Sequence, residues 1–170
     1  IIIHEKSPKL IKKQKNIIKF KNIKWAANLK KIDSLPSLFL ANEFFDAIPI
    51  KQFSKNENSW FEKFVHIDAN KKLSFVNKKI NIKSIEKKID FKISEKQNFI
   101  EYSPIGLEYL KGIFKFIERN DGGLLIIDYG YFAEKMKDTL QAIHNQKHSN
   151  ILENIGKSDI TYNINFYLIE

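Results

Sequence analysis

The 170-residue sequence contains no cysteine, only six glycines and a single arginine, Arg119. Without cysteine there can be no disulfide bond and no thiol chemistry, which fits a reducing compartment. All six glycines lie from Gly106 onward, so no glycine-rich loop follows a strand in the first half of the chain. No apolar run approaches the roughly 20 residues that span a bilayer, and no signal peptide is visible, so we expect no membrane insertion.

The net charge of +9 raises the possibility of nucleic-acid binding. The kind of basic residue argues against it, because proteins that read phosphates and base edges usually rely on the planar arginine fork. Here the basic residues other than histidine are lysines, apart from Arg119, and they are scattered along the chain. We therefore expect no nucleic-acid partner.

The composition is that of a globular protein, with 43% hydrophobic residues and 14 phenylalanines. Short apolar runs at Ile1–His4, Leu38–Ala41 and Leu124–Ile127 are typical of buried strands. Helices are predicted after Ser7-Pro8 (to about residue 20) and after Ser103-Pro104, because serine caps a helix and proline suits its first position. Alternating strands and helices predict an α/β fold with a mainly parallel sheet.

One segment breaks this alternation. Residues 48–76 show a period of two around a polar turn at Lys55–Ser59, which predicts an antiparallel β insertion that includes Trp60–Ile67. Ile80–Lys96 is ambiguous, and the chain after Gly130 is predicted to be loop-like as far as Thr161. His144 and His148 have the spacing of metal ligands on a helix, but without cysteine or a suitable acidic residue we do not predict a zinc site.

The strongest candidates for chemistry follow the predicted strands. Asn42, Glu43 and Asp46 come directly after one strand, and Asp128 ends the next long one. In an open α/β sheet, ligands bind beyond the carboxyl ends of the strands, so these side chains are predicted to share one crevice. The alternative is local: Asn42 or Asp46 could cap a turn, and Asp128 could start one. Another set could line a pocket but is more simply explained as core: Phe44, Phe45, Phe53 and Trp60.

Glu5 ends the first predicted strand. In nucleotide-binding α/β folds, an acidic residue at such a position accepts hydrogen bonds from ribose hydroxyls. Alternatively, Glu5 could cap the helix that begins after Ser7 or point to water.

Several segments together resemble the MidA-like family of S-adenosylmethionine-dependent methyltransferases, which includes arginine methyltransferases that act as mitochondrial complex I assembly factors. Residues 42–53, Asn-Glu-Phe-Phe-Asp-Ala-Ile-Pro-Ile-Lys-Gln-Phe, are similar to the family's signature. Glu-Lys-Ser-Pro-Lys-Leu at 5–10 and Leu-Leu-Ile-Ile-Asp-Tyr-Gly at 124–130 resemble further motifs. So do Asp-Thr-Leu-Gln at 138–141 and Ser-Asp-Ile-Thr at 158–161, and all occur in the family's order.

The resemblance implies a partial Rossmann-like class I methyltransferase core over residues 1–170, with the parent domain continuing beyond both ends. It implies S-adenosylmethionine as the cofactor, bound by Glu5 and Asn42, and catalysis by Glu43, Asp46 and Asp128. The family's glycine-rich loop lies upstream of the segment that matches Ile1–Glu5, so this chain alone is expected to bind the cofactor weakly or not at all.

The implied substrate is an arginine side chain on a protein, such as a subunit of respiratory complex I. The implied location is the cytoplasm for a bacterial member and the mitochondrial matrix for a eukaryotic one. A protein-binding assembly module without catalysis is the alternative function.

Overall fold

The computed structural model describes residues 1–28 and 32–170, which form two compact units. The first unit comprises residues 1–39 and 110–124, and the second comprises residues 40–109 and 125–170. Strand β3 (Ser37–Asn42), helix α3 (Pro104–Asn120) and strand β8 (Gly122–Ile127) each contribute residues to both units. The sequence predicts a loop or turn over residues 29–35, and part of this segment, residues 29–31, lies outside the described part of the chain.

The first unit begins with strand β1 (Ile2–His4), which pairs in parallel with β2 (Lys24–Ala26). Helix α1 (Pro8–Ile17) connects them and begins where the sequence predicts, with the Ser7 hydroxyl accepting the amide of Leu10 at 3.3 Å. It ends at Ile17, before the predicted end near residue 20. In the same unit, the Phe39 ring of β3 packs edge-on against Phe116 of α3 at 5.3 Å.

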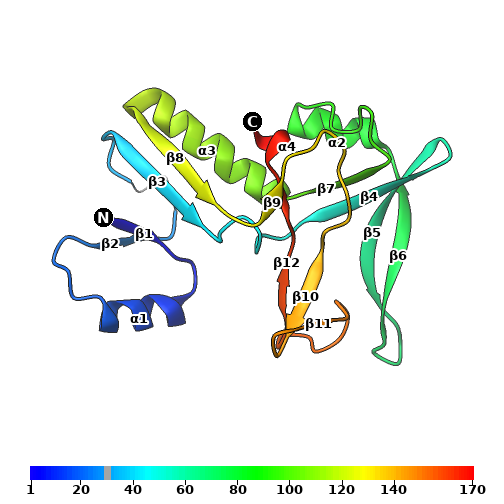
Figure 1. Ribbon diagram of the computed structural model, residues 1–170, viewed down its shortest axis with the longest axis horizontal. Coiled ribbons are helices and arrows are strands. Elements are labelled where there is room, and N and C mark those ends of the chain that lie inside the picture. The colour runs from blue at the N-terminus through cyan, green and yellow to red at the C-terminus, as the bar shows by residue number, and fades with distance from the viewer. Residues whose placement is uncertain (29–31) are drawn as a thin grey trace. The chain divides into compact units, whose positions relative to one another are not determined.

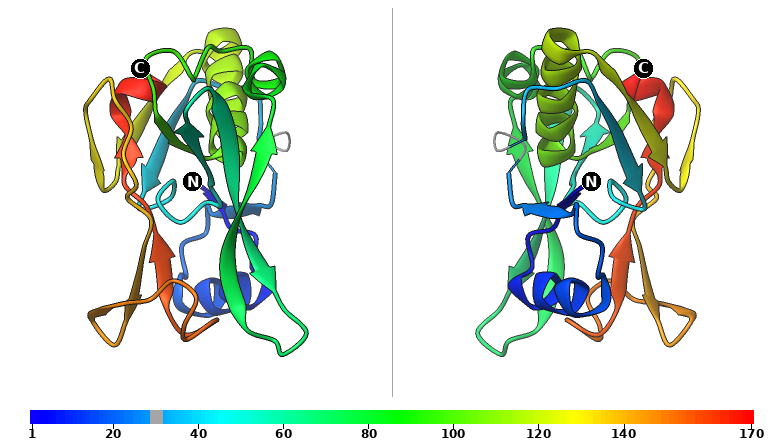
Figure 2. Two further views of the ribbon diagram at one scale, coloured as in Figure 1. Left: turned by 90° about the vertical axis from the view of Figure 1, so that its right-hand side faces the viewer. Right: turned by 90° about the vertical axis from the view of Figure 1, so that its left-hand side faces the viewer.

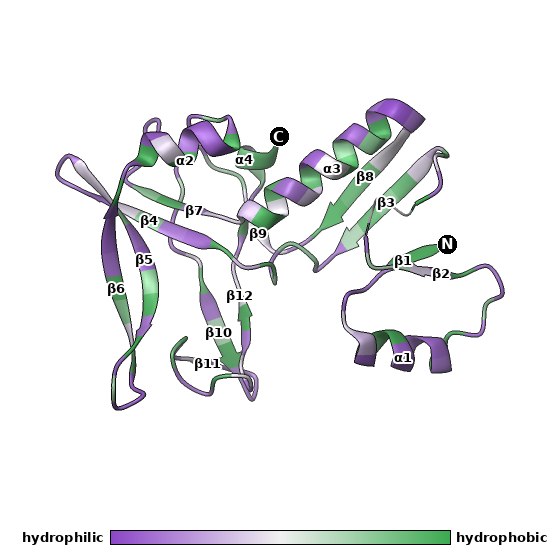
Figure 3. Ribbon diagram, turned by 180° about the vertical axis from the view of Figure 1, so that it is seen from behind, coloured by the Kyte–Doolittle hydropathy of each residue, from purple (hydrophilic) through white to green (hydrophobic). Residues whose placement is uncertain are grey.

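Strands β3 and β8 are hydrogen-bonded neighbours and run in the same direction (Figure 1). Hydrogen bonds at both ends of the pair fix this direction, from the Ser37 amide to the Asp121 carbonyl and from the Glu43 amide to the Ile127 carbonyl. Both strands are largely hydrophobic (Figure 3), as expected for a parallel pair. The prediction that they are buried is wrong for this chain, because Leu38 and Leu40 are 78% and 65% exposed and Leu125 and Ile127 are 51% and 49% exposed. The predicted adjacency of the strands before Asn42 and Asp128 is therefore confirmed, whereas the strand before Glu5 pairs with β2 in a separate sheet.

The second unit contains a four-stranded antiparallel sheet in the order β6-β5-β4-β7 (Figure 2). Its strands are β4 (Lys51–Asn56), β5 (Ser59–Ile67), β6 (Leu73–Ile80) and β7 (Phe99–Tyr102). The antiparallel insertion is thus confirmed, and it continues beyond Val76 to Ile80. Helix α2 (Ile82–Ile89) occupies the segment whose pattern is ambiguous. The α/β class holds, with both parallel and antiparallel pairs.

The core of this unit is a cluster of Phe53, Trp60, Ile93, Ile100 and Tyr102. Phe53 and Ile100 are at most 1% exposed, and the Phe53 ring stacks on Tyr102 at 6.1 Å. Full burial of such side chains stabilises the fold by about 1.5–3 kcal/mol each. Phe53 and Trp60 therefore belong to the core.

The prediction of a loop between Gly130 and Thr161 is wrong. Strands β10 (Gln141–His144), β11 (Lys147–Ser149) and β12 (Asp159–Thr161) form an antiparallel sheet. Strand β9 (Gly130–Tyr131) pairs in parallel with β13 (Ile164–Asn165), and α4 (Phe166–Ile169) follows. Each of these strands has at most four residues, too few for an alternating pattern to stand out. His144 and His148 lie on strands, not on a helix. In the pairing of β10 with β11, His144 lies opposite Lys147 and His148 lies opposite Ile143.

Within the described residues, no helix is long and apolar enough to cross a membrane.

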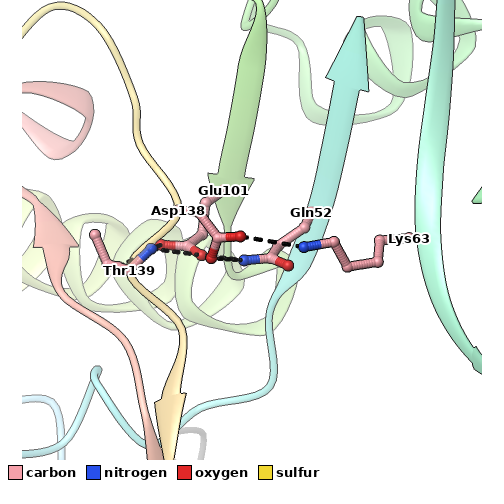
Figure 4. A network of polar contacts seen from close by, with 5 residues as sticks. All are labelled: Gln52, Lys63, Glu101, Asp138 and Thr139. Atoms are coloured by element: carbon pink, nitrogen blue, oxygen red, sulfur yellow. Dashed lines mark hydrogen bonds and ion pairs between the residues drawn. The ribbon is translucent and has the colours of Figure 1, made fainter. Parts of the chain in front are cut away.

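A partly buried polar network joins the antiparallel sheet to the segment before β10 (Figure 4). The Gln52 amide nitrogen donates to Glu101 Oε2 at 2.5 Å and to Asp138 Oδ1 at 2.7 Å, and Lys63 pairs with Asp138 at 3.1 Å. The amide and the hydroxyl of Thr139 both donate to Glu101. Burial raises the pKa of Glu101, although the bonds from Thr139 and Gln52 oppose this shift. The network holds the Asp138–Thr139 segment against the sheet.

We predict that Thr139→Val lowers the free energy of unfolding by about 1–3 kcal/mol, because a buried carboxylate loses a donor. The Thr139 hydroxyl also accepts the Asn163 amide at 2.9 Å, and this bond is lost too. Urea denaturation measures the change. Thr161→Val is the matched control, since Thr161 is only partly buried and accepts one long bond, 3.3 Å, from Gln141. Equal losses in the two variants would contradict a special role for the network.

Candidate functional site

The turn after β3 carries three of the predicted site residues. Asn42 is the last residue of β3, and both Asn42 and Glu43 are exposed. Glu43 has a left-handed backbone conformation, with φ of 44°, and its amide donates to the Ile127 carbonyl at 2.8 Å. Such a conformation costs a non-glycine residue about 1–2 kcal/mol. The turn therefore presents the Glu43 carboxylate to solvent at the carboxyl end of the parallel pair.

Asp128 follows β8 and holds this turn from the other strand. Its Oδ2 atom accepts three successive backbone amides, from Phe44 at 3.2 Å, Phe45 at 2.9 Å and Asp46 at 3.3 Å. Its Oδ1 atom accepts the Tyr129 amide at 2.9 Å. The structure thus brings Asp128 together with the Glu43–Asp46 turn. The bond from Tyr129 also matches the alternative that Asp128 starts a turn.

Asp46 is buried, with 6% of its surface exposed. Its Oδ1 atom has no hydrogen-bond partner among the residues that the structure describes. Burial raises the pKa of Asp46, and the negative charges of Asp128, Glu43 and Asp159 raise it further, while a hydrogen bond from the Ala47 amide opposes the shift. An unpaired, buried carboxyl oxygen is costly and is suited to a ligand that donates a hydrogen bond or carries positive charge.

Aromatic side chains pack beside this turn. The Phe45 ring is 3% exposed and meets Phe44 edge-on at 5.1 Å, and Phe44 meets Tyr109 in the same way at 5.2 Å. Such edge-on pairs stabilise the packing by about 0.5–1.5 kcal/mol beyond area burial. Phe45 is therefore a core residue, which is the simpler of the two explanations that the sequence allows. It anchors the turn that carries Glu43 and Asp46.

Glu5 lies in the first unit, directly after β1. Its Oε1 atom accepts the Ser7 amide at 2.8 Å and its Oε2 atom accepts the Gln14 side chain at 3.4 Å. Gln14 in turn accepts the indole N–H of Trp25 at 2.8 Å. Glu5 thus supports the start of α1, in agreement with the alternative that it caps this helix. Two carboxylate oxygens have about four acceptor positions, so Glu5 retains capacity to bind ribose hydroxyls.

Two buried ionisable residues were not predicted as part of the site. Glu101 belongs to the network described above, and Tyr162 is 7% exposed. The Tyr162 amide donates to the Asp46 carbonyl at 3.2 Å. Burial raises the pKa of Tyr162, with further increases from the charges of Asp128, Glu101 and Asp46. Tyr162 directly follows the Ser-Asp-Ile-Thr motif at 158–161, and its place next to this motif is the sequence feature that could have identified it as a site residue. Three separate motifs therefore converge near Asp46.

Comparisons with known proteins show the family to which the chain belongs. A family model described as "Putative S-adenosyl-L-methionine-dependent methyltransferase" matches residues 1–170. "Protein arginine methyltransferase NDUFAF7 homolog, mitochondrial" of Caenorhabditis elegans is 31% identical over 150 residues, covering 85% of this chain and 34% of the relative. The mouse protein "Protein arginine methyltransferase NDUFAF7, mitochondrial" is 30% identical over 146 residues, covering 85% and 33%. The chain thus spans about a third of the length of these relatives.

Solved structures show the same fold. A structure from Burkholderia thailandensis, described as a "likely methyl transferase" bound to S-adenosyl-homocysteine, superposes with a TM-score of 0.75 at 17% identity. The match covers 99% of this chain and 46% of that one. A second, native structure from the same organism gives a TM-score of 0.76. Since the family model covers every residue, the chain belongs to this family of S-adenosylmethionine-dependent methyltransferases.

Proposed function

We propose that this chain is part of a protein methyltransferase that transfers a methyl group from S-adenosylmethionine to an arginine side chain. The observation that carries the proposal is the buried Asp46 carboxyl, with its unpaired Oδ1 atom, beside Glu43 and Asp128 at the end of the parallel pair. The names of the C. elegans and mouse relatives support arginine as the acceptor.

The cofactor is proposed to contact Glu5 and Asn42. Glu5 has free acceptor positions for the ribose hydroxyls, and Asn42 is exposed at the end of β3. When bound, the cofactor supplies an electrophilic methyl group on a sulfonium. The described residues contain no group of three or more potential metal ligands.

The acceptor is proposed to lie against Glu43 and Asp46. A guanidinium group has five donors in a fixed fork, which paired carboxylates hold in one orientation. In the transfer, a nitrogen–carbon bond forms as the sulfur–carbon bond breaks, and the nitrogen loses one proton. Asp46 is suited to accept that proton, because its raised pKa makes its carboxylate a stronger base than that of an ordinary aspartate. Asp128 is the third proposed acidic residue of this site.

The protein substrate is proposed to be a subunit of respiratory complex I or a similar protein. The relatives are named mitochondrial, so a eukaryotic form of this protein is proposed to act in the mitochondrial matrix and a bacterial form in the cytoplasm.

A non-catalytic assembly module remains the second candidate, and one surface favours it. Val65, Ile67 and Phe75 are 56%, 58% and 41% exposed on the β5–β6 hairpin. Val65 and Phe75 are paired across the strands, so they share a face with Ile67. An exposed apolar face of this kind often contacts another protein. Methylation of a substrate by the full-length protein separates the two functions.

We predict that Glu43→Gln in the full-length protein lowers methyl transfer by about 10²–10⁴-fold, because an orienting or proton-accepting carboxylate is lost. Cofactor affinity should stay nearly unchanged. Glu5→Gln should do the reverse and weaken cofactor binding first. Calorimetry with S-adenosylmethionine and single-turnover methylation measure the two effects.

Glu57→Gln is the matched control for Glu43. Glu57 is also exposed and has a left-handed backbone, with φ of 51°, but it lies in the β4–β5 turn. It should change neither quantity. Normal methylation by a folded Glu43→Gln variant would show that Glu43 is only structural and would favour the assembly module.

We predict that Asp46→Asn makes the folded protein more stable at pH 7 and less active. The pKa of Asp46 is higher in the folded state than in the unfolded state, so protonation of Asp46 favours the folded protein. This stabilisation is present below about pH 4 and is lost as the pH rises through the folded pKa. Asparagine does not titrate, so the gain in unfolding free energy should be larger at pH 7 than at pH 4. Urea denaturation at both pH values tests this. A variant that loses stability more at pH 7 would contradict the electrostatic argument.

A further inference from the structure

We propose that Asp128 is a positioning residue: its carboxylate clamps the backbone of residues 44–46 and thereby fixes where Glu43 and Asp46 present their side chains. This proposal gives Asp128 a role different from that of a group that reacts with substrate. It rests on the proposed function only where catalysis is concerned, because the clamp itself can be measured without any methylation.

The geometry of the clamp is the first argument. Three consecutive amide N–H groups converge on the single Oδ2 atom of Asp128, at 2.9–3.3 Å. Consecutive amides that point to one side form a concave site for an anion, and here the anion is a side chain of the same protein. Hydrogen bonds to a charged acceptor are about twice as strong as neutral ones. The turn is therefore held by a group that comes from a strand more than 80 residues later.

The hydrogen bonds that the Asp128 carboxylate already accepts are the second argument. Oδ2 accepts the three amides and Oδ1 accepts the Tyr129 amide, so both oxygens are already engaged by the backbone. A carboxylate in this state is poorly placed to take a proton from a substrate. In contrast, Asp46 Oδ1 has no partner within residues 1–28 and 32–170, and Glu43 is exposed.

The conformation of Glu43 is the third argument. Its left-handed backbone is uncommon for a glutamate and costs about 1–2 kcal/mol, so the hydrogen bonds on either side of it help to hold it. Its amide is fixed to Ile127, directly before Asp128, and the next three amides are fixed to Asp128 itself. Both ends of the strained residue are thus held by the end of β8, which makes Asp128 the group that sets the direction of the Glu43 side chain.

The clamp is tested first by amide hydrogen exchange in the full-length protein. Asp128→Ala removes the acceptor, and Asp128→Asn keeps one uncharged oxygen. We expect the amides of Phe44, Phe45 and Asp46 to exchange at least about tenfold faster in the alanine variant, with a smaller increase in the asparagine variant. Asp68→Asn is the control, because Asp68 accepts the Lys72 amide in the β5–β6 turn and should leave these three amides unchanged.

Amides of the β4–β5 pair report whether each variant is folded. If these amides stay protected and the exchange of residues 44–46 is unchanged in Asp128→Ala, the clamp does not exist and the proposal is overturned. This result does not depend on whether the protein methylates anything.

The second test is a double-mutant cycle in single-turnover methylation, with Glu43→Gln, Asp128→Asn and the double variant. If Asp128 acts through Glu43, the double variant should lose little more activity than Glu43→Gln alone. Asp128→Asn should also shift the pH profile of transfer toward lower pH, since the carboxylate at 128 raises the pKa of Asp46. Losses that multiply, with no pH shift, would assign Asp128 a direct role and overturn the proposal. If the wild-type protein methylates no substrate, the proposed function fails while the exchange result still decides the clamp.

Discussion

The contact between the Asp128 carboxylate and the amides of residues 44–46 is the constraint on which the rest of the site depends. The chain leaves β3 and turns sharply, so its amides lose the strand partners that would otherwise accept their hydrogen bonds. Buried amides without acceptors are costly, and here one carboxylate supplies the acceptor for three of them. The same contact sets the ends of two parallel strands side by side, where polar groups can serve a common ligand.

This solution has an electrostatic cost that falls on Asp46. Burial raises the pKa of Asp46, and the Asp128 charge that the amides need raises it further, with additional contributions from Glu43 and Asp159. A turn designed only for stability would have a neutral residue in place of Asp46. Local conflicts of this type are most often found at functional sites, where a fold gives up some stability for chemistry. The strained backbone of Glu43 in the same turn fits that explanation.

The sequence predicted what local patterns determine. Strands over 38–41 and 124–127, the two Ser-Pro helix starts and the antiparallel insertion all follow from composition and periodicity over a few residues, and the structure has each of them. The predicted burial of the two strands is not observed, because each exposes large hydrophobic side chains. The strands after residue 140 are too short to show a period and were predicted as loop. The partners of Asp128 lie 82–84 residues away in sequence, so no local pattern could reveal that its carboxylate binds backbone amides. Glu101 was missed for the same reason, since its partner Thr139 is 38 residues distant.

Two buried carboxyl groups of the second unit, Asp46 and Glu101, show how hydrogen bonds distinguish a structural acidic residue from one proposed to bind a ligand. Burial raises the pKa of both Glu101 and Asp46, so the pKa alone does not distinguish them. Both oxygens of Glu101 have donors, from Gln52 and Thr139, as expected for a group that holds two segments together. One oxygen of Asp46 has none among the described residues, and the neighbouring charges are negative. Because an unsatisfied buried acceptor is retained at a cost, a cationic or proton-donating ligand is the physical reason for Asp46 that the geometry supports best.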